Sequence, residues 1–154
     1  MYKKNNKLRI AHLDSKFAKI RILKNIETPP DGWVKAIRTT LNMSLSQLAR
    51  RLKKNPVTVM EMEQREKDKS ITLKKLIEIG EALDLQFVYG FFPKESSLEK
   101  MIEKRAMEVA YEIVMRTSHT MKLEEQENTE KRLRNAIHEK AEELKRELPK
   151  HLWD

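Results

Sequence analysis

Residues 43–65 read MSLSQLARRLKKNPVTVMEMEQR, and they contain two short helical patterns separated by three polar residues. Ser44 and Gln47 match a capping box at the start of the first helix, because each side chain can satisfy a backbone donor of the other residue. Asn55 and Pro56 predict the start of the second helix, since asparagine is a favoured N-cap and proline suits the first helical position. The mostly apolar inward positions of both helices recur every three or four residues; they are Leu45, Leu48, Ala49, Leu52, Val59, Met62 and Glu63. Two short helices joined by so tight a turn predict a helix-turn-helix.

The rest of the chain is predicted to be helical, with one exception. An amphipathic pattern over residues 10–26 ends at Thr28–Gly32, because residues before proline avoid the helical conformation. Further helices are predicted from Trp33 and from Leu73, and a C-terminal helical hairpin is predicted from a second capping box at Ser96 and Glu99. The expected fold class is mostly α, with a five-helix domain around the helix-turn-helix and the helical hairpin behind it.

The exception is residues 85–92, LQFVYGFF, which are aromatic and β-branched and predict one short β-strand. A single strand cannot satisfy its own backbone, and the same strand of a second copy is the simplest partner. We therefore expect a homodimer, with the contact made by Leu85, Phe87, Val88, Tyr89 and Phe91, and the C-terminal helical extension is a candidate for a second contact between the subunits.

Positive charge is concentrated in the first ninety-odd residues. The 154-residue chain has a net charge of +8. Residues 1–30 contain eight basic and two acidic side chains, residues 31–94 twelve and eight, and residues 95–154 twelve and fourteen. We divide the chain there into a basic N-terminal arm and helix (1–30), a helix-turn-helix domain with the dimerising strand (31–94) and a C-terminal helical extension (95–154). The excess of positive charge in the first ninety-odd residues creates an electrostatic field that attracts polyanions, DNA among them. Many Lys-rich proteins are nonetheless basic without binding any polyanion.

The composition disfavours several other classes of protein. There are no cysteines, which removes disulfides, thiolate zinc sites and cysteine nucleophiles. The four histidines are scattered, and no phosphate loop, metal-ligand pair or nucleophile elbow is present, so we expect no enzyme, no cofactor and no metal. No apolar run approaches the roughly 18 residues of a membrane span, and no secretory signal is recognisable, so we expect a cytoplasmic protein. A membrane-surface role for the basic helix at 10–26 is an alternative to a DNA-backbone arm or a packing helix.

In a helix-turn-helix the second helix presents its outward N-terminal side chains to the major groove of DNA. The base-reading candidates are Pro56, Val57, Thr58, Met60 and Glu61. Glu61 can accept from a cytosine amino group, Thr58 can hydrogen-bond to base edges, and Val57 can contact a thymine methyl. The phosphate-binding candidates surround that helix; they are Gln47, Arg50, Arg51, Lys53, Lys54, Lys67 and Lys69. The plainer alternatives are a solvated helix end at Arg50–Lys54 and a protein interface at Val57 and Met60.

The run Met43–Leu52, followed by Asn55, Val59, Met62 and Glu63, resembles the Xre/Cro type of helix-turn-helix over roughly residues 33–90. Three further motifs make the whole chain similar to the family called mobile mystery protein A; they are Pro29–Trp33, Glu61–Glu66 and Ser118–Met121. The resemblance implies a toxin–antitoxin-like or mobile-element module encoded beside a Fic-domain partner. The chain departs from the pattern at Lys53, because many Xre-type turns have glycine there and a left-handed conformation is unfavourable for lysine.

The expected function is a dimeric, sequence-specific repressor or antitoxin-like autoregulator that binds double-stranded DNA. The alternative is an antitoxin whose helical tail, residues 96–154, engages the neighbouring gene product, with DNA binding secondary.

Overall fold

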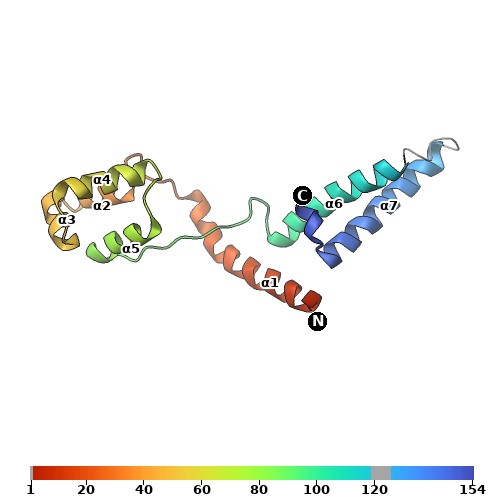
Figure 1. Ribbon diagram of the computed structural model, residues 1–154, viewed down its shortest axis with the longest axis horizontal. Coiled ribbons are helices and arrows are strands. Elements are labelled where there is room, and N and C mark those ends of the chain that lie inside the picture. Colours follow the sequence, from red (N-terminus) through yellow and green to blue (C-terminus); the bar gives the residue numbers. More distant parts are fainter. Residues whose placement is uncertain (1, 119–125) are drawn as a thin grey trace. The chain divides into compact units, whose positions relative to one another are not determined.

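The computed structural model describes residues 2–118 and 126–154 (Figure 1). Helices make up most of this part of the chain, which agrees with the predicted, mostly α fold class. The chain divides into two compact units, one formed by residues 23–90 and the other by residues 1–22 with 91–154. No helix within the described ranges is both long enough and apolar enough to cross a membrane.

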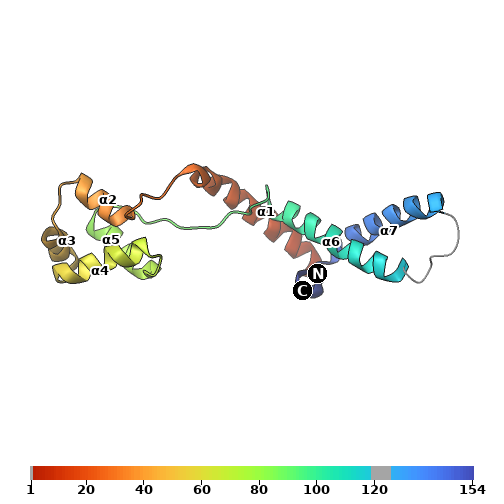
Figure 2. The ribbon, with the colours of Figure 1, turned by 90° about the horizontal axis from the view of Figure 1, so that it is seen from above.

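The 23–90 unit contains four helices around one apolar core (Figure 2). They are α2 (Trp33–Thr40), α3 (Leu45–Leu52), α4 (Pro56–Lys67) and α5 (Leu73–Ala82). The predicted inward positions of α3 and α4 are confirmed, since all of them are buried except Leu45, which is half-buried. The buried apolar residues come from all four helices and the turn after α5; they are Val34, Leu48, Ala49, Leu52, Val59, Met62, Ile79 and Leu83.

The predicted start signals of α3 and α4 are both formed. Ser44 Oγ accepts from the Gln47 backbone N–H at 3.2 Å, and Gln47 Oε1 accepts from the Ser44 backbone N–H at 2.7 Å, which completes the capping box. Asn55 Oδ1 accepts from the Thr58 backbone N–H at 2.7 Å, with Pro56 at the first helical position. These contacts set the first turns of two helices that share the core, and therefore fix where each helix begins.

The second unit combines the two ends of the chain. It contains α1 (Tyr2–Ile20), α6 (Leu98–Ser118), α7 (Gln126–Glu147) and a 3-10 helix, η2 (Lys150–Trp153). Another 3-10 helix, Arg21–Asn25, follows α1. The predicted C-terminal hairpin is present, with α6 and α7 running side by side (Figure 1). Its buried core residues are Ile102, Ala106, Val109, Ala110, Ala141, Leu144 and Leu152.

The predicted five-helix domain and the predicted cap of α6 both differ from the structure. The first of the five predicted helices, α1, is grouped with α6 and α7, which leaves four helices in the 23–90 unit. Asp14 of α1 caps α6 by accepting from the backbone N–H groups of Leu98 at 2.7 Å and Glu99 at 3.4 Å. Ser97, rather than Ser96, adds the local cap by accepting from Lys100 N–H at 3.1 Å. A carboxylate distant in sequence therefore takes the place of the predicted box.

The predicted strand is not confirmed, because residues 85–92 belong to no strand in the single chain. A strand needs a second strand to pair its N–H and C=O groups, and the described residues form none with which it could pair. The rings of Phe87 and Tyr89 are nonetheless stacked, with centroids 6.1 Å apart and planes 16° apart. Alternate side chains lie on the same side of an extended backbone, so this stacking fits a locally extended segment without a partner.

Candidate nucleic-acid interface

The turn between α3 and α4 has one residue in the left-handed conformation. Lys53 has φ 54° and ψ 41°, in the position where the family pattern favours glycine. The Lys54 N–H donates to Ala49 O at 2.9 Å and the Lys53 N–H donates to Arg50 O at 3.2 Å. These two bonds form a Schellman motif, which satisfies the last carbonyl groups of α3. The chain therefore makes the tight turn with lysine and leaves a cation at its apex.

The outer face of α4 consists of Val57, Met60, Glu61 and Gln64, which recur at helical spacing opposite the buried Val59. Val57 is 59% and Met60 52% exposed, and the other two are also exposed. The remaining base-reading candidates differ in position: Pro56 is exposed at the first turn, whereas Thr58 is half-buried beside this face. The five predicted residues thus lie together in the first half of α4.

Gln64 is a residue of this outer face that the sequence analysis missed. Its Nε2 donates to the two carboxylate oxygens of Asp68 at 3.1 and 3.0 Å. Its position seven residues after Val57, two helical turns along the same face, is the signal that would have identified it. Glu61 makes only a weak ion pair, because its carboxylate lies 3.9 Å from Arg65 Nη2 and both side chains are more than half exposed.

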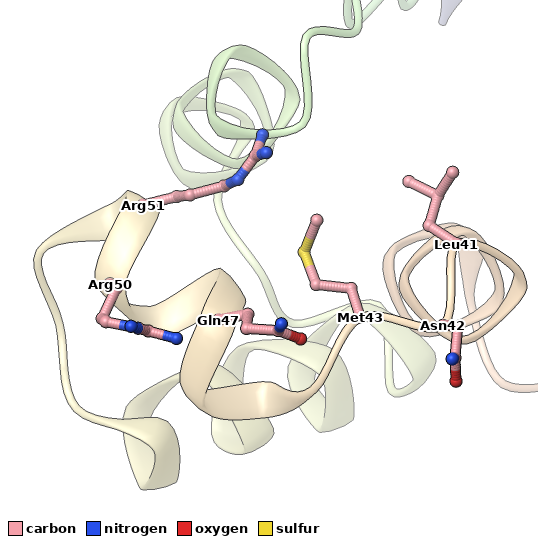
Figure 3. Close-up of a pocket in the computed structure, with 6 residues that line it drawn as sticks. All are labelled: Leu41, Asn42, Met43, Gln47, Arg50 and Arg51. Carbon is pink, nitrogen blue, oxygen red and sulfur yellow. The ribbon is translucent and has the colours of Figure 1, made fainter.

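The structure separates the predicted phosphate ligands of α3. A pocket beside this helix is lined by Gln47, Arg50 and Arg51, and also by Asn42, which was not predicted (Figure 3). Arg50 is exposed, and its side chain has no hydrogen bond or ion pair with any described residue. Arg51 instead extends toward α5, where its Nη1 donates to Ala82 O at 3.1 Å. The side-chain oxygen of Gln47 is used in the capping box, so its side-chain NH2 group is the part left for a ligand.

The four predicted lysines also fall into two groups. Lys53 and Lys69 are exposed, and within the described part of the chain neither has a side-chain partner. Lys54 Nζ lies 2.9 Å from Glu78 Oε1 of α5, and Lys67 Nζ donates to Asp31 Oδ1 at 2.8 Å. This bond raises the pKa of Lys67 and lowers the pKa of Asp31. Lys67 also lies roughly 14 Å along the helix from Thr58, at 1.5 Å per residue.

Among the predicted cations, Arg50 and Lys53 are therefore the two that have no side-chain partner in the described part of the chain and also lie near the start of α4. They lie at the end of α3 and in the turn that leads directly into α4. Lys67 and Lys69 lie at the other end of α4, and Arg51 and Lys54 are engaged by α5 or the turn that follows it.

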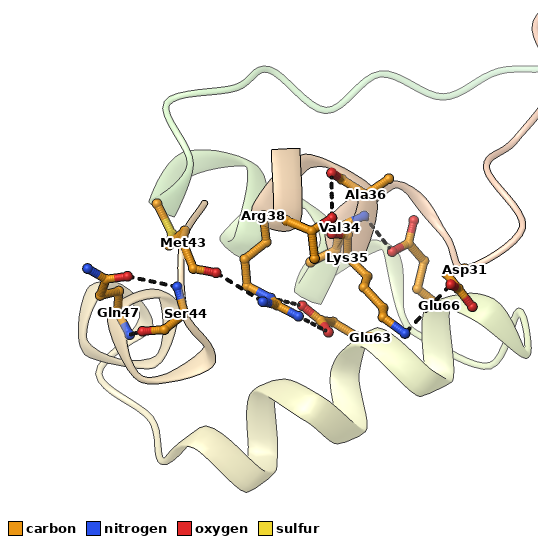
Figure 4. Close-up of polar contacts among 11 residues, drawn as sticks. Asp31, Val34, Lys35, Ala36, Arg38, Met43, Ser44, Gln47, Glu63 and Glu66 are labelled. Carbon is orange, nitrogen blue, oxygen red and sulfur yellow. Dashed lines mark hydrogen bonds and ion pairs between the residues drawn. The ribbon is translucent and has the colours of Figure 1, made fainter. Parts of the chain in front are cut away.

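The inner side of α4 is fixed to α2 by buried ion pairing (Figure 4). Arg38 Nε and Nη2 donate to the two oxygens of Glu63 at 2.6 and 3.0 Å, and Arg38 Nη1 donates to Met43 O at 2.9 Å. The two residues are only 9% and 6% exposed, and the hydrogen bond to Glu63 raises the pKa of Arg38. The sequence analysis placed Glu63 inward but missed Arg38; a buried carboxylate requires a cationic partner, and that was the available signal.

A second carboxylate of α4 caps α2. Glu66 accepts from the backbone N–H groups of Trp33 at 2.8 Å and Val34 at 2.9 Å. Gly32 makes this approach possible, since a Cβ at that position would lie 2.9 Å from Glu66 Oε2. Glu63 and Glu66 therefore fix the orientation of α4 from the side opposite its outer face.

The predicted dimerisation residues follow α5. Leu85, Val88, Tyr89 and Phe91 are exposed and Phe87 is half-buried. Leu85, Phe87 and Val88 form one side of an apolar groove of about 530 Å³ that is also lined by residues of α2 and α5. A dimer contact through this segment stays a prediction.

The third motif of the family resemblance begins at Ser118, the last residue of α6, and its other residues lie outside the described ranges. Comparison of the chain with models of protein families, with curated proteins and with solved structures gives no match.

Proposed function

We propose that the 23–90 unit binds double-stranded DNA with sequence specificity, and that the protein is a transcriptional regulator rather than an enzyme. The observation that carries the proposal is the exposed outer face of α4, beside two cations, Arg50 and Lys53, that no described side chain neutralises. Polar and small apolar side chains next to unpaired cations fit a base-reading helix flanked by phosphate contacts.

The local chemistry of α4 suits the major groove, which is about 12 Å wide and admits one helix. The first turn of α4 has the positive end of the helix dipole, which favours the approach of phosphate. Glu61 would accept from a cytosine amino group, the Thr58 hydroxyl would bond a base edge, and Val57 would contact a thymine methyl. Arg50 and Lys53 would bind backbone phosphates and set the register of α4.

The rigidity of α4 supports the same proposal. Base discrimination requires hydrogen-bonding groups placed within a fraction of an ångström, on elements that do not shift. The Arg38–Glu63 pair and the Glu66 cap connect α4 to α2 on the side opposite the outer face. The outer face can then meet DNA without reorganisation of the helix. Regulation of an operon shared with a Fic-domain partner rests on the family resemblance alone.

The test is a fluorescence-anisotropy titration of the full chain against its own upstream DNA and a scrambled duplex of equal length. Each duplex is titrated at several salt concentrations. Glu61→Ala and Thr58→Ala should each reduce the preference for the upstream duplex, by about 1–3 kcal/mol for every hydrogen bond to a base edge that the substitution removes. Arg50→Gln should weaken binding to both duplexes and reduce the slope of log K against log salt by about one.

The matched control is Arg132→Gln, which removes an exposed arginine from α7 of the other unit. It should leave both affinity and salt slope near those of the wild type. Equal affinity of the wild type for the two duplexes at every salt concentration would contradict sequence-specific binding. An effect of Arg132→Gln as large as that of Arg50→Gln would show that general charge, and not the α3–α4 surface, governs binding.

A further inference from the structure

The hairpin of α6 and α7 has an open groove on its surface, which we call the α6–α7 groove. It has a volume of about 770 Å³. Its α6 side is formed by Met107, Glu108, Tyr111 and Glu112, and its α7 side by Arg134, Ile137 and His138. Met107 is 40% and Tyr111 55% exposed, although buried residues such as Ala106 and Val109 already form the core on another side of α6. The hairpin therefore has a second apolar surface besides the one that builds its core.

Charge is divided between the two sides of this groove. The α6 side has the carboxylates of Glu108 and Glu112, whereas the α7 side has the guanidinium of Arg134 and the imidazole of His138. The side chains of Glu112 and His138 have no hydrogen bond or ion pair with any described residue. Glu108 and Arg134 each have one local partner, Arg105 at 3.3 Å and Glu130 at 2.5 Å. Exposed ion pairs within one helix are weak, so both side chains remain available for a stronger contact.

This division of charge selects one way of packing two hairpins face to face. The helices α6 and α7 are antiparallel, because Lys145 near the end of α7 lies 3.7 Å from Glu103 near the start of α6. A twofold axis parallel to the helices places α6 of each copy against α7 of the other, at the same level along the bundle. Glu108 and Glu112 then face Arg134 and His138 of the second copy. An axis perpendicular to the helices would place α6 against α6 and oppose like charges.

We propose that the α6–α7 groove is the surface through which two copies of this chain associate, as an antiparallel four-helix bundle. Met107, Tyr111 and Ile137 of both copies form the central layer, and the two acidic sides pair with the two basic sides. A twofold contact of this kind is self-complementary, as isologous interfaces must be. Every neighbouring pair of helices is antiparallel, which is the common arrangement of up-and-down bundles.

This contact deepens the proposed function, because a dimer of the regulator would present two copies of α4 to two half-sites, and in that meaning it rests on the proposal of DNA binding. The contact itself does not require DNA. It also differs from the dimer predicted through residues 85–91, so the two locations can be compared directly.

Sedimentation velocity of the full chain without DNA tests the inference over a range of protein concentrations. The wild type should form a dimer. Tyr111→Asp, Glu112→Arg and Arg134→Glu should each weaken the dimer by at least about tenfold, since each buries a charge or opposes like charges. The combined Glu112→Arg and Arg134→Glu variant should recover much of the wild-type affinity, because both sides of the symmetric contact are then reversed. Arg132→Glu, an equal charge reversal at an exposed position of α7, should have no effect.

Far-UV circular dichroism of each variant shows whether the hairpin is folded, and the combined variant keeps the test decisive even if Tyr111→Asp unfolds. A monomeric wild type, or a dimer that the three single variants leave unchanged, would overturn the inference. A dimer that is dissociated by Val88→Asp, and by none of the α6–α7 variants, would also overturn the inference. Base discrimination by Glu61 and Thr58 is measured separately, so failure of the dimer contact is distinguishable from failure of DNA binding.

Discussion

Lys53 is the residue at which stability and the proposed function oppose each other. Its φ of 54° is in the left-handed region, which costs a side-chain-bearing residue about 1 kcal/mol relative to glycine. We expect Lys53→Gly to raise the free energy of unfolding by about 0.5–1 kcal/mol. The same change should weaken DNA binding, because it removes a cation beside the first turn of α4.

Two measurements check this prediction: urea unfolding followed by circular dichroism, and anisotropy with the upstream duplex. Lys53→Asn is the control, since asparagine tolerates the left-handed conformation but lacks the charge. It should weaken DNA binding as much as Lys53→Gly does. If Lys53→Gly stabilises the protein and leaves DNA affinity intact, Lys53 does not contact phosphate.

The buried pair of Arg38 and Glu63 gives the second prediction at this scale. Glu63→Gln leaves the Arg38 guanidinium buried without a counter-charge and should lower the free energy of unfolding by about 3 kcal/mol. Arg38→Met combined with Glu63→Leu removes both charges and should recover most of that loss, because a well-packed apolar pair avoids the desolvation cost. Urea unfolding followed by Trp33 fluorescence in a Trp153→Phe background reports on this unit. Equal losses in the single and combined variants would contradict the assignment.

Among the elements, α2 begins at a cap that comes from a residue distant in sequence. Its N-terminal N–H groups are capped by Glu66, and Gly32, with φ 85°, leaves room for that carboxylate. Gly32→Ala should lower the free energy of unfolding by about 1–3 kcal/mol, since the new methyl group adds backbone strain and displaces the cap. A double-mutant cycle with Glu66→Ala checks the mechanism: the two losses should be less than additive. Strict additivity would show that the glycine acts through its backbone conformation alone.

The helix starts were predictable where both partners of a cap lie within one turn. Ser44 with Gln47 and Asn55 with Thr58 are pairs of that kind, and the structure confirms both. The caps of α2 and α6 come instead from Glu66 and Asp14, which are 32 and 84 residues away in sequence from Val34 and Leu98. No local pattern contains that information.

The candidate interface was predictable to the same degree. The alternation of buried and exposed residues along α4 follows from helical spacing, so the outer face was found except for Gln64. Which cations are available depends on tertiary partners, such as Glu78 for Lys54 and Asp31 for Lys67. The predicted strand is not formed in the single chain, because its β-forming side chains favour an extended conformation but cannot supply a second strand.

At the scale of the whole molecule, the two chain ends form one unit and the 23–90 segment is inserted between them in sequence. The charge distribution divides the sequence into three consecutive parts. The structure instead groups the first part with the last, because α1 contacts α6. Asp14 connects these two helices, and the Arg21 guanidinium adds a hydrogen bond to Ser96 O. The N-terminal helix is therefore an integral part of the unit that contains the proposed dimer surface.

Replacement of Asp14 tests this organisation. Asp14→Ala removes the acceptor for the N–H groups of Leu98 and Glu99 and should lower the free energy of unfolding of the α6–α7 unit by about 1 kcal/mol. Asp14→Asn keeps one oxygen acceptor and should lose less. Trp153 lies in η2, which Arg105 fastens to α6 through Leu152 O at 2.7 Å, so its fluorescence in a Trp33→Phe background follows this unit. If alanine and asparagine leave the Trp153 unfolding curve equally unchanged, the Asp14 cap does not stabilise α6.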